Sequence, residues 1–148
     1  MKETPFTVIA DISRLARRAF DARAREIGVT RPQWQVLVVL NRHEGVNQGG
    51  LAELLDVEPI TVCRMVDRLQ EADLVQRRPD PADRRSWRLF LTAKASELLA
   101  QLRPLVEQLE VEAFEGIGND ERAAMIVTLD RLRNNLAPRA SGKVASNG

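Results

Sequence analysis

Cysteine, histidine and long apolar runs are scarce in this chain of 148 residues, and each scarcity excludes a class of structure. The single cysteine, Cys63, cannot form a disulfide within the chain, and one cysteine with one histidine argues against a structural metal site. The longest apolar runs, 36–40 and 123–127, have five residues each, whereas a membrane span needs about 20. Residues 1–7 also lack the apolar run of a signal peptide. We therefore expect no membrane span, no metal and a reducing, cytoplasmic location.

Catalytic motifs are missing as well. The sequence contains no glycine-rich phosphate loop, no HExxH motif and no nucleophile beside a recognisable base. These absences predict a protein that is not an enzyme and needs no cofactor. The length and the 44% of apolar residues are those of one ordinary domain, which at this size buries enough surface to fold without disulfides.

Over the whole chain the basic and acidic residues nearly balance, with 22 Lys and Arg and 21 Asp and Glu. This near balance argues against a strongly basic, non-specific coat for nucleic acid. The local distribution differs, because residues 74–92 hold five arginines and only two aspartates. This segment is the most basic concentrated part of the chain.

Capping residues and apolar spacing predict six helices. Thr4 and Pro5 are typical of a helix start, and Thr30 with Gln33 fits a capping box. The expected helices are 5–27, 31–43, a short third helix capped by Asn47, 59–72, a long fifth helix capped by Thr92 and a last helix capped by Asn119.

Between the fourth and fifth expected helices the apolar period changes from 3.6 to 2. The apolar residues of 87–91 recur at alternate positions, and the run 74–78 can pair with them. The intervening loop, 79–85, is rich in Pro and Asp and carries charge at its tip. These patterns predict a mostly α fold with a small two-stranded β-hairpin, the element order of a winged helix-turn-helix.

The fourth expected helix has an apolar face and a polar face. On a helical wheel Val62, Met65, Val66 and Leu69 fall within about 60° of one another. The opposite side carries Ile60, Thr61, Arg64, Asp67, Arg68 and Glu71. Arginine binds the O6 and N7 atoms of guanine, threonine bonds bases or phosphates, and an exposed isoleucine contacts a thymine methyl. This face suits the major groove of DNA; a solvated helix face with paired charges is the alternative.

Several segments resemble the MarR family of bacterial regulators. The matching residues are 61–69, Leu74-Val75, Asp80-Pro81-Ala82-Asp83-Arg84-Arg85 and Leu91-Thr92, with a further match over 30–40. The likeness covers roughly residues 5–136, and its most specific part is the hairpin pattern of Asp-Pro, Asp and two arginines before a strand that ends in Leu-Thr. The resemblance implies a dimeric winged-helix transcription factor whose fourth helix reads the major groove and whose hairpin, or wing, inserts an arginine into the minor groove.

By position, Arg84 or Arg85 takes the wing role that the resemblance implies. A flexible arginine on a narrow hairpin tip can enter a narrow minor groove, where the negative potential is high, and Asp83 can fix its guanidinium. A solvated turn is the alternative. The expected DNA-binding residues are Ile60, Thr61, Arg64, Arg68, Asp83, Arg84 and Arg85.

The resemblance also implies that the first, fifth and sixth helices form a dimer. Leucines along the fifth helix step by four, three and four residues, a spacing typical of an interhelical seam, although Pro104 should bend this helix or remove one bond. The expected dimer residues are Ile9, Ile12, Leu98, Leu102, Leu105, Leu109 and Leu132. The corresponding division is a dimerisation helix at 1–29, a DNA-binding lobe at 30–92, C-terminal dimerisation helices at 93–137 and a disordered tail at 138–148.

Many members of the family are released from DNA by small aromatic carboxylates or phenolic compounds. In this chain Arg14, Arg17, Trp34 and His43 are the candidates for lining such an effector site. Each has a structural alternative, because Trp34 fits a core position, the arginines fit a solvated helix face, and His43 fits a helix C-terminus.

Two features depart from the common pattern of the family. The third helix begins with the pair Gly49-Gly50, which weakens its first turn. Cys63 occupies a position where Ser or Thr is more usual, and it is either a small half-buried filler or an oxidisable group on the DNA-binding helix. Peroxide-sensing members carry their reactive cysteine in the first helix, and residues 5–27 contain none.

The sequence therefore predicts a homodimeric, sequence-specific regulator that binds double-stranded DNA at a pseudo-palindromic operator. Repression that a small aromatic or phenolic ligand relieves is the expected mode. The alternative is a winged-helix protein-protein interaction module without DNA binding. Such a module would be expected to lose the wing arginines, and both are present.

Overall fold

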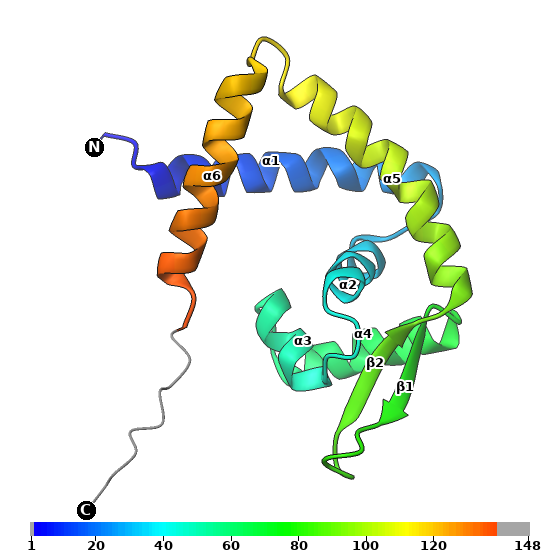
Figure 1. Ribbon diagram of the computed structural model, residues 1–148. Coiled ribbons are helices and arrows are strands. Elements are labelled where there is room, and N and C mark those ends of the chain that lie inside the picture. The colour runs from blue at the N-terminus through cyan, green and yellow to red at the C-terminus, as the bar shows by residue number, and fades with distance from the viewer. Residues whose placement is uncertain (1, 139–148) are drawn as a thin grey trace, which may run out of the picture. The chain divides into compact units, whose positions relative to one another are not determined.

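The computed structural model describes residues 2–138, which form six helices and one antiparallel hairpin in the predicted order (Figure 1). The bounds are α1 Pro5–Glu26, α2 Arg31–Arg42, α3 Gln48–Leu55, α4 Pro59–Glu71, β1 Val75–Pro79, β2 Trp87–Leu91, α5 Ala93–Ala113 and α6 Asn119–Leu136. The chain divides into two compact units, Met1–Glu110 and Val111–Gly148, with the boundary inside α5. The predicted disordered tail lies outside the described residues except for Pro138.

Side-chain caps start the helices of the first unit as the sequence predicts. Thr30 Oγ1 accepts from the Gln33 amide at 3.4 Å, and Gln33 Oε1 accepts from the Thr30 amide at 3.0 Å. Asn47 Oδ1 accepts from the Gly50 amide at 2.7 Å, and Thr92 Oγ1 accepts from an amide in the first turn of α5 at 3.1 Å. These caps fix where α2, α3 and α5 begin.

The glycine pair of α3 has a packing reason. A Cβ atom on Gly50 would lie 2.6 Å from Cγ2 of Val46, too close for any side chain, whereas one on Gly49 would lie 3.5 Å from the Asn47 oxygen, an ordinary contact. Only Gly50 is therefore required by the close approach of the preceding loop.

The core of the lobe joins α2, α3, α4 and the hairpin. The buried side chains are Val36, Leu37 and Leu40 from α2, Leu51 and Ala52 from α3, Val62, Val66 and Leu69 from α4, and Leu74, Val75 and Leu89 around the hairpin. Met65 is half-buried and packs against this cluster. The apolar face predicted for α4 is confirmed, and its burial leaves the polar face exposed.

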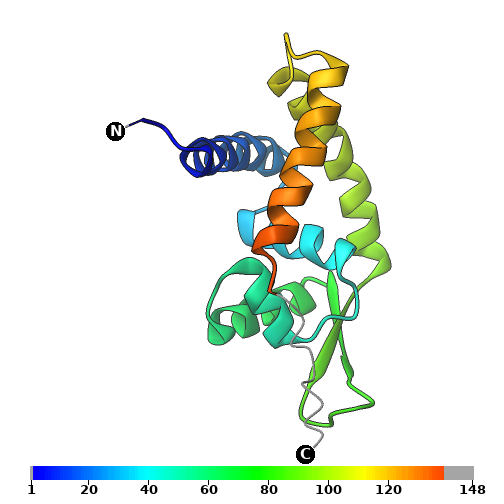
Figure 2. The same cartoon turned by 60° about the vertical axis from the view of Figure 1, so that its left-hand side comes forward.

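The hairpin pairs Val75 with Leu91 and Pro79 with Trp87 in antiparallel register. Its first strand therefore begins one residue later than the predicted run 74–78. The other edge of β2 is also paired, because Leu89 donates to the Val46 carbonyl at 2.9 Å and accepts from the Gly45 amide at 2.9 Å. Figures 1 and 2 both show the turn between the strands extending beyond the helices of the lobe.

The leucine seam of α5 packs against α1 within the chain, and its predicted contact with a second copy stays a prediction. Leu102 is buried together with Phe20 and Ala24 of α1 and with Val29. Leu98, Leu105 and Leu109 are half-buried against the same cluster. The interhelical spacing of α5 is confirmed for its contact with α1, and the half-buried leucines keep part of their surface exposed. The helix continues through Pro104.

The second unit contains the end of α5 and α6. Asn119 was expected to cap α6 but is its first helical residue, since Gly118 precedes the helix and donates its amide to Glu121 Oε2 at 2.9 Å. The guanidinium of Arg122 lies 4.2 Å from the ring centre of Phe114. Among residues 2–138, none of the helices is both long and apolar enough to cross a membrane.

Candidate nucleic-acid interface

The polar face of α4 presents the residues that the sequence assigns to the major groove. Ile60 is 62% exposed, and Thr61, Arg64 and Arg68 are also exposed. Within residues 2–138, Arg64 and Arg68 form no hydrogen bond or ion pair through their side chains. Asp67 of the same face forms an ion pair outside α4, so the alternative of charges paired along the helix does not describe this face.

The turn of the hairpin is built by two aspartates. Asp80 Oδ1 accepts from the Ala82 amide at 2.9 Å and lies 3.4 Å from the Arg88 guanidinium. The Ala82 amide, with a smaller contribution from Arg88, holds the pKa of Asp80 below its usual value. Asp83 was expected to fix an arginine guanidinium. It instead accepts from the backbone amide of Arg85 at 3.0 Å, because the tight turn brings that amide closest.

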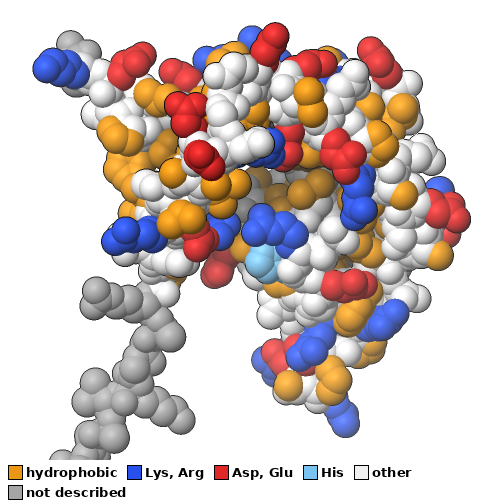
Figure 3. Space-filling view, turned by 45° about the horizontal axis from the view of Figure 1, so that its top comes forward, with side chains coloured by type: hydrophobic (Ala, Val, Ile, Leu, Met, Phe, Trp, Pro, Cys, Tyr) orange, Lys and Arg blue, Asp and Glu red, His pale blue; other side chains and the backbone are white. Residues whose placement is uncertain are grey.

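Of the five arginines of the basic segment 74–92, three have partners for their guanidinium groups and two have none within the described residues. Arg78 stacks on Phe90, with its guanidinium 4.1 Å from the ring centre, and Arg88 pairs with Asp80. Arg77 is held between helices, as described next. In the part of the chain that the structure describes, only Arg84 and Arg85 of this segment have guanidinium groups without a partner. Both are exposed, and Figure 3 shows basic side chains at this protruding end of the molecule.

Arg77 lies at the junction of α3, α4 and β1. Its Nε donates to Gln48 Oε1 at 2.7 Å, its Nη1 to Gln70 Oε1 at 2.8 Å, and its Nη2 to the Cys63 carbonyl at 3.3 Å. The same Nη2 lies 2.7 Å from Asp67 Oδ1. Only 16% of the Arg77 side chain is exposed.

No role was assigned to Arg77 from the sequence, although its position in the strand indicated one. Val75 is buried and Arg77 follows it by two, so both side chains lie on the inner face of β1. A charged residue at an inward position of a strand requires partners, and the amides and the carboxylate around it supply them.

Cys63 is half-buried, and its backbone carbonyl accepts the bond from Arg77. With Gln48, Gln70, Arg77 and Trp87 it lines an open pocket of about 520 Å³. The half-buried position matches the first half of the prediction, and the choice between a small filler and an oxidisable group stays open.

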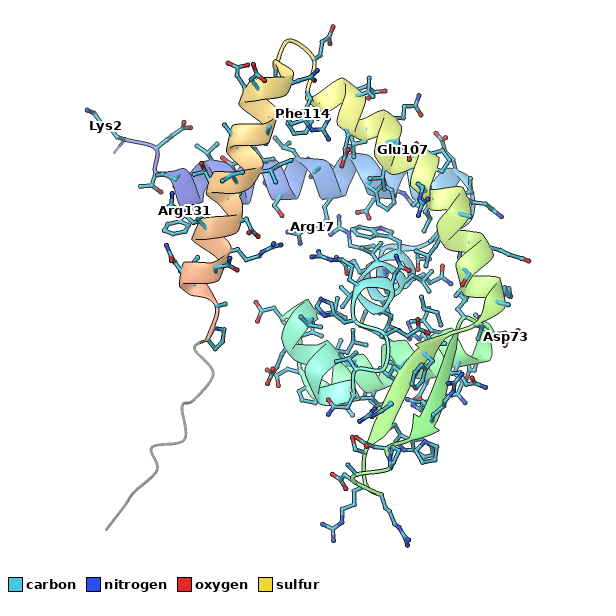
Figure 4. The ribbon with its side chains drawn as sticks, in the orientation of Figure 1. Lys2, Arg17, Asp73, Glu107, Phe114 and Arg131 are labelled. Carbon is cyan, nitrogen blue, oxygen red and sulfur yellow. The ribbon has the colours of Figure 1, made fainter. Side chains whose placement is uncertain are left out.

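The four candidate effector residues do not lie together. Arg17 and Trp34 line one open pocket of about 570 Å³ with residues of α2 and α3, and Figure 4 shows Arg17 pointing from α1 toward those helices. Arg14 instead pairs with Asp11 along α1. His43 is the C-cap residue of α2, which matches its structural alternative.

Trp34 also has a structural role. Its ring meets that of Phe20 edge-on at 4.8 Å, and its indole N–H donates to Asp21 Oδ1 at 2.7 Å. Arg31 binds the other oxygen of Asp21, and this bond holds the pKa of the carboxyl below its usual value. Sequence reasoning missed this link between α1 and α2.

The three remaining candidate dimer residues lie at the surface. Ile12 of α1 is 59% exposed, and Ile9 of α1 and Leu132 of α6 are half-buried. No group of three or more His, Cys, Asp or Glu within residues 2–138 is arranged to hold a metal ion.

The helix-turn-helix of α3 and α4, the exposed polar face of α4 and the arginine-tipped hairpin define a winged helix-turn-helix protein. A sequence profile of the MarR family matches residues 27–86. Over residues 27–86 this chain is therefore similar to the MarR family of transcriptional regulators, and the elements described above are those of its winged-helix fold.

Solved structures of transcriptional regulators are similar to most of this chain. A MarR transcriptional regulator from Methanosarcina mazei Go1 is 25% identical, with a TM-score of 0.80, over 90% of this chain and 96% of that chain. A MarR-family regulator from Silicibacter pomeroyi is 27% identical, with a TM-score of 0.76, over 88% of each chain. The transcriptional repressor CouR, bound to a 23-mer DNA duplex, is 27% identical, with a TM-score of 0.72, over 88% of this chain and 92% of that chain.

Proposed function

We propose that this chain is a homodimeric repressor that binds a pseudo-palindromic operator and is released by a small aromatic or phenolic ligand. The observation that carries the DNA-binding part is the set of free guanidinium groups on α4 and at the hairpin tip. In this proposal Ile60, Thr61, Arg64 and Arg68 face the major groove, and Arg84 and Arg85 enter the flanking minor groove, with Asp83 shaping the turn that carries them.

Repression is the mode that the likeness to CouR supports, since that protein is a transcriptional repressor bound to DNA. A repressor needs only to occupy its operator and exclude the transcription machinery. The test is a reporter gene behind the promoter of the chain's own gene. Expression should fall when the protein is supplied, and a rise would contradict repression.

Exposed apolar residues in both units support the dimer. In α1 the side chains of Phe6, Ile12 and Leu15 are more than half exposed. In α6 the exposed apolar residues include Ile126, Val127, Leu129 and Leu136. Apolar surface of this extent on so small a chain is typical of a protein-protein interface. The division proposed is therefore a DNA-binding lobe at 30–92 flanked by dimerisation helices at 1–29 and 93–137.

Light scattering at micromolar concentration tests the dimer. The mass should be twice the 16.6 kDa of the chain, and replacement of Ile12 and Ile126 by aspartate should shift it toward the monomer. Leu102→Ala is a matched contrast, because this buried leucine contacts α1 of its own chain, and its loss should lower stability without dissociating the dimer. A monomeric wild-type protein would contradict the proposal.

The pocket that Arg17 and Trp34 share supports the effector. An arginine and a tryptophan that line one pocket suit an aromatic carboxylate, because an aromatic ring can stack on an indole while the carboxylate pairs with a guanidinium. Arg14 and His43 do not line this pocket, so the proposed site rests on Arg17 and Trp34.

A Trp87→Phe variant tests this site, since it leaves Trp34 as the only tryptophan. Benzoate, salicylate and related phenols should change the Trp34 fluorescence and lower DNA affinity at the same concentrations. Arg17→Gln should abolish both effects, whereas Arg14→Gln on the same helix should retain them. Equal loss in both variants would indicate a general charge effect and contradict the site.

Fluorescence anisotropy of the purified protein tests the function as a whole. The probes are the promoter of its own gene and a scrambled duplex of the same composition. Preference for the promoter, reduced in Arg84→Ala, would support the repressor. Equal weak binding to both duplexes, repeated with duplexes selected from a random pool, would favour the winged-helix module that binds a protein instead.

A further inference from the structure

Arg77 directs its guanidinium inward although it lies in the most basic segment of the chain. Its three nitrogens donate to one amide oxygen of α3, one amide oxygen of α4 and one backbone carbonyl of α4, and Nη2 also faces the carboxylate of Asp67. An arginine has five N–H donors in a fixed fork, so these partners account for most of them. A side chain held in this way is not available to a phosphate.

Asp67 is the acidic residue that Arg77 restrains on the DNA-facing side of α4. Arg64 lies three residues before it and Arg68 directly after it. Residues three apart on a helix surface are neighbours, so a released Asp67 carboxylate would pair with Arg64. Such a pair would occupy the guanidinium that has to reach a base.

We propose that Arg77 is a positioning residue for DNA recognition, which holds Asp67 away from Arg64 and ties α4 to α3 and the wing. This inference rests on the proposed function, because it assigns Arg64 to base contact. It treats Arg77 as a residue that touches no DNA, in contrast to Arg84 and Arg85 of the same segment.

The test measures binding of four variants to the tightest duplex that the wild-type protein selects from a random pool. These are Arg77→Met, Arg77→Lys, the double variant Arg77→Met with Asp67→Asn, and Arg84→Ala as the phosphate-contact control. Thermal unfolding of each variant verifies that it is folded at the assay temperature. Arg77→Lys keeps a positive charge beside Asp67 and serves as the conservative variant if Arg77→Met does not fold.

Arg77→Met should lower affinity about tenfold, since hydrogen bonds to charged groups are lost and Asp67 is released. The slope of log affinity against log salt should stay at the wild-type value, whereas Arg84→Ala should reduce its magnitude by about 0.9, one phosphate contact. The double variant should recover most of the affinity, because an amide at position 67 forms no ion pair with Arg64. Arg77→Lys should bind between Arg77→Met and the wild type.

Three results would overturn the role of Arg77 while the proposed function stands. These are wild-type affinity in Arg77→Met, a salt slope that falls in Arg77→Met as it does in Arg84→Ala, and a double variant that binds as weakly as Arg77→Met alone. A merely structural role would show no recovery on loss of the Asp67 charge. A wild-type protein that enriches no duplex would overturn the proposed function itself, and the role of Arg77 with it.

Discussion

The indole N–H of Trp34 donates to Oδ1 of Asp21 at 2.7 Å, and this bond joins α2 to α1. Arg31 binds the other carboxylate oxygen of Asp21. The half-buried Asp21 of α1 therefore accepts hydrogen bonds from two residues of α2. Because Trp34 also lines the proposed effector pocket, a ligand there would act directly on the link between these helices.

Asp21→Asn should lower the free energy of unfolding by about 1.5–3 kcal/mol at pH 7, since a hydrogen-bonded carboxylate is replaced by a neutral amide. Urea unfolding measures this difference. Asp11→Asn is the matched control on α1, because Asp11 pairs only with the exposed Arg14, and its loss should cost at most about 1 kcal/mol. Equal losses in the two variants would contradict a special role for Asp21.

The same carboxyl predicts a pH dependence. Arg31 lowers the pKa of Asp21 in the folded protein below its ordinary value of 3.8. Its contribution to stability is therefore complete above that ordinary value and is lost as the pH falls through the lowered pKa. The difference between wild type and Asp21→Asn should be constant from pH 7 to about pH 5 and shrink below about pH 4. If the stability difference between wild type and Asp21→Asn grows on acidification, folding raises the pKa of Asp21 and the prediction is wrong.

The glycine pair of α3 offers a contrast between neighbours. Gly50→Ala should destabilise the protein by about 1–3 kcal/mol, because its Cβ would meet Val46 at 2.6 Å. Gly49→Ala should stabilise it by about 0.4–1 kcal/mol, since that site has room and alanine restricts the unfolded chain. Chemical denaturation of both variants checks the signs, and the same sign in both would refute the packing argument.

Arg64→Ala should weaken specific binding by about 1–3 kcal/mol and relax the preference for one base pair, because a bidentate contact to guanine is lost. Anisotropy with duplexes changed at single positions measures both effects. A uniform loss over all duplexes would assign Arg64 to the phosphate backbone instead.

Arg84→Ala should weaken binding mainly to duplexes with A·T-rich flanks, where the minor groove is narrow and its potential most negative. Replacement of those flanks by G·C pairs should remove most of the difference between variant and wild type. If the variant loses equal affinity on both sets of duplexes, the wing does not read the minor groove.

Much of the fold was predictable because its determinants are local. The caps at Thr30 and Asn47 and the change of apolar period after Leu74 are written in a few neighbouring residues, and the structure has them as predicted. The partners of long-range contacts were not predictable in this way. Nothing near Leu102 in sequence indicates whether α1 of its own chain or another copy covers it.

The candidate site shows the same contrast between features that local sequence determines and features that long-range contacts determine. The exposed face of α4 followed from the helical period, whereas the bonds of Arg77 join residues up to 29 positions apart. Polar partners at such separations are specified by tertiary packing, which one sequence does not display. The inward register of Arg77 indicated only that partners had to exist.

The salt dependence of binding tests whether α4 and the wing recognise DNA. Anisotropy from 50 to 250 mM salt, with the promoter of the chain's own gene and a scrambled duplex, should give a linear log-log plot with a slope of about −0.9 for each phosphate contact. We expect a steep slope on both duplexes and tighter binding to the promoter at every salt concentration, with the promoter preference reduced in Arg64→Ala. A flat salt dependence, or a promoter preference unaffected by Arg64→Ala and Arg84→Ala together, would contradict recognition of DNA by α4 and the wing.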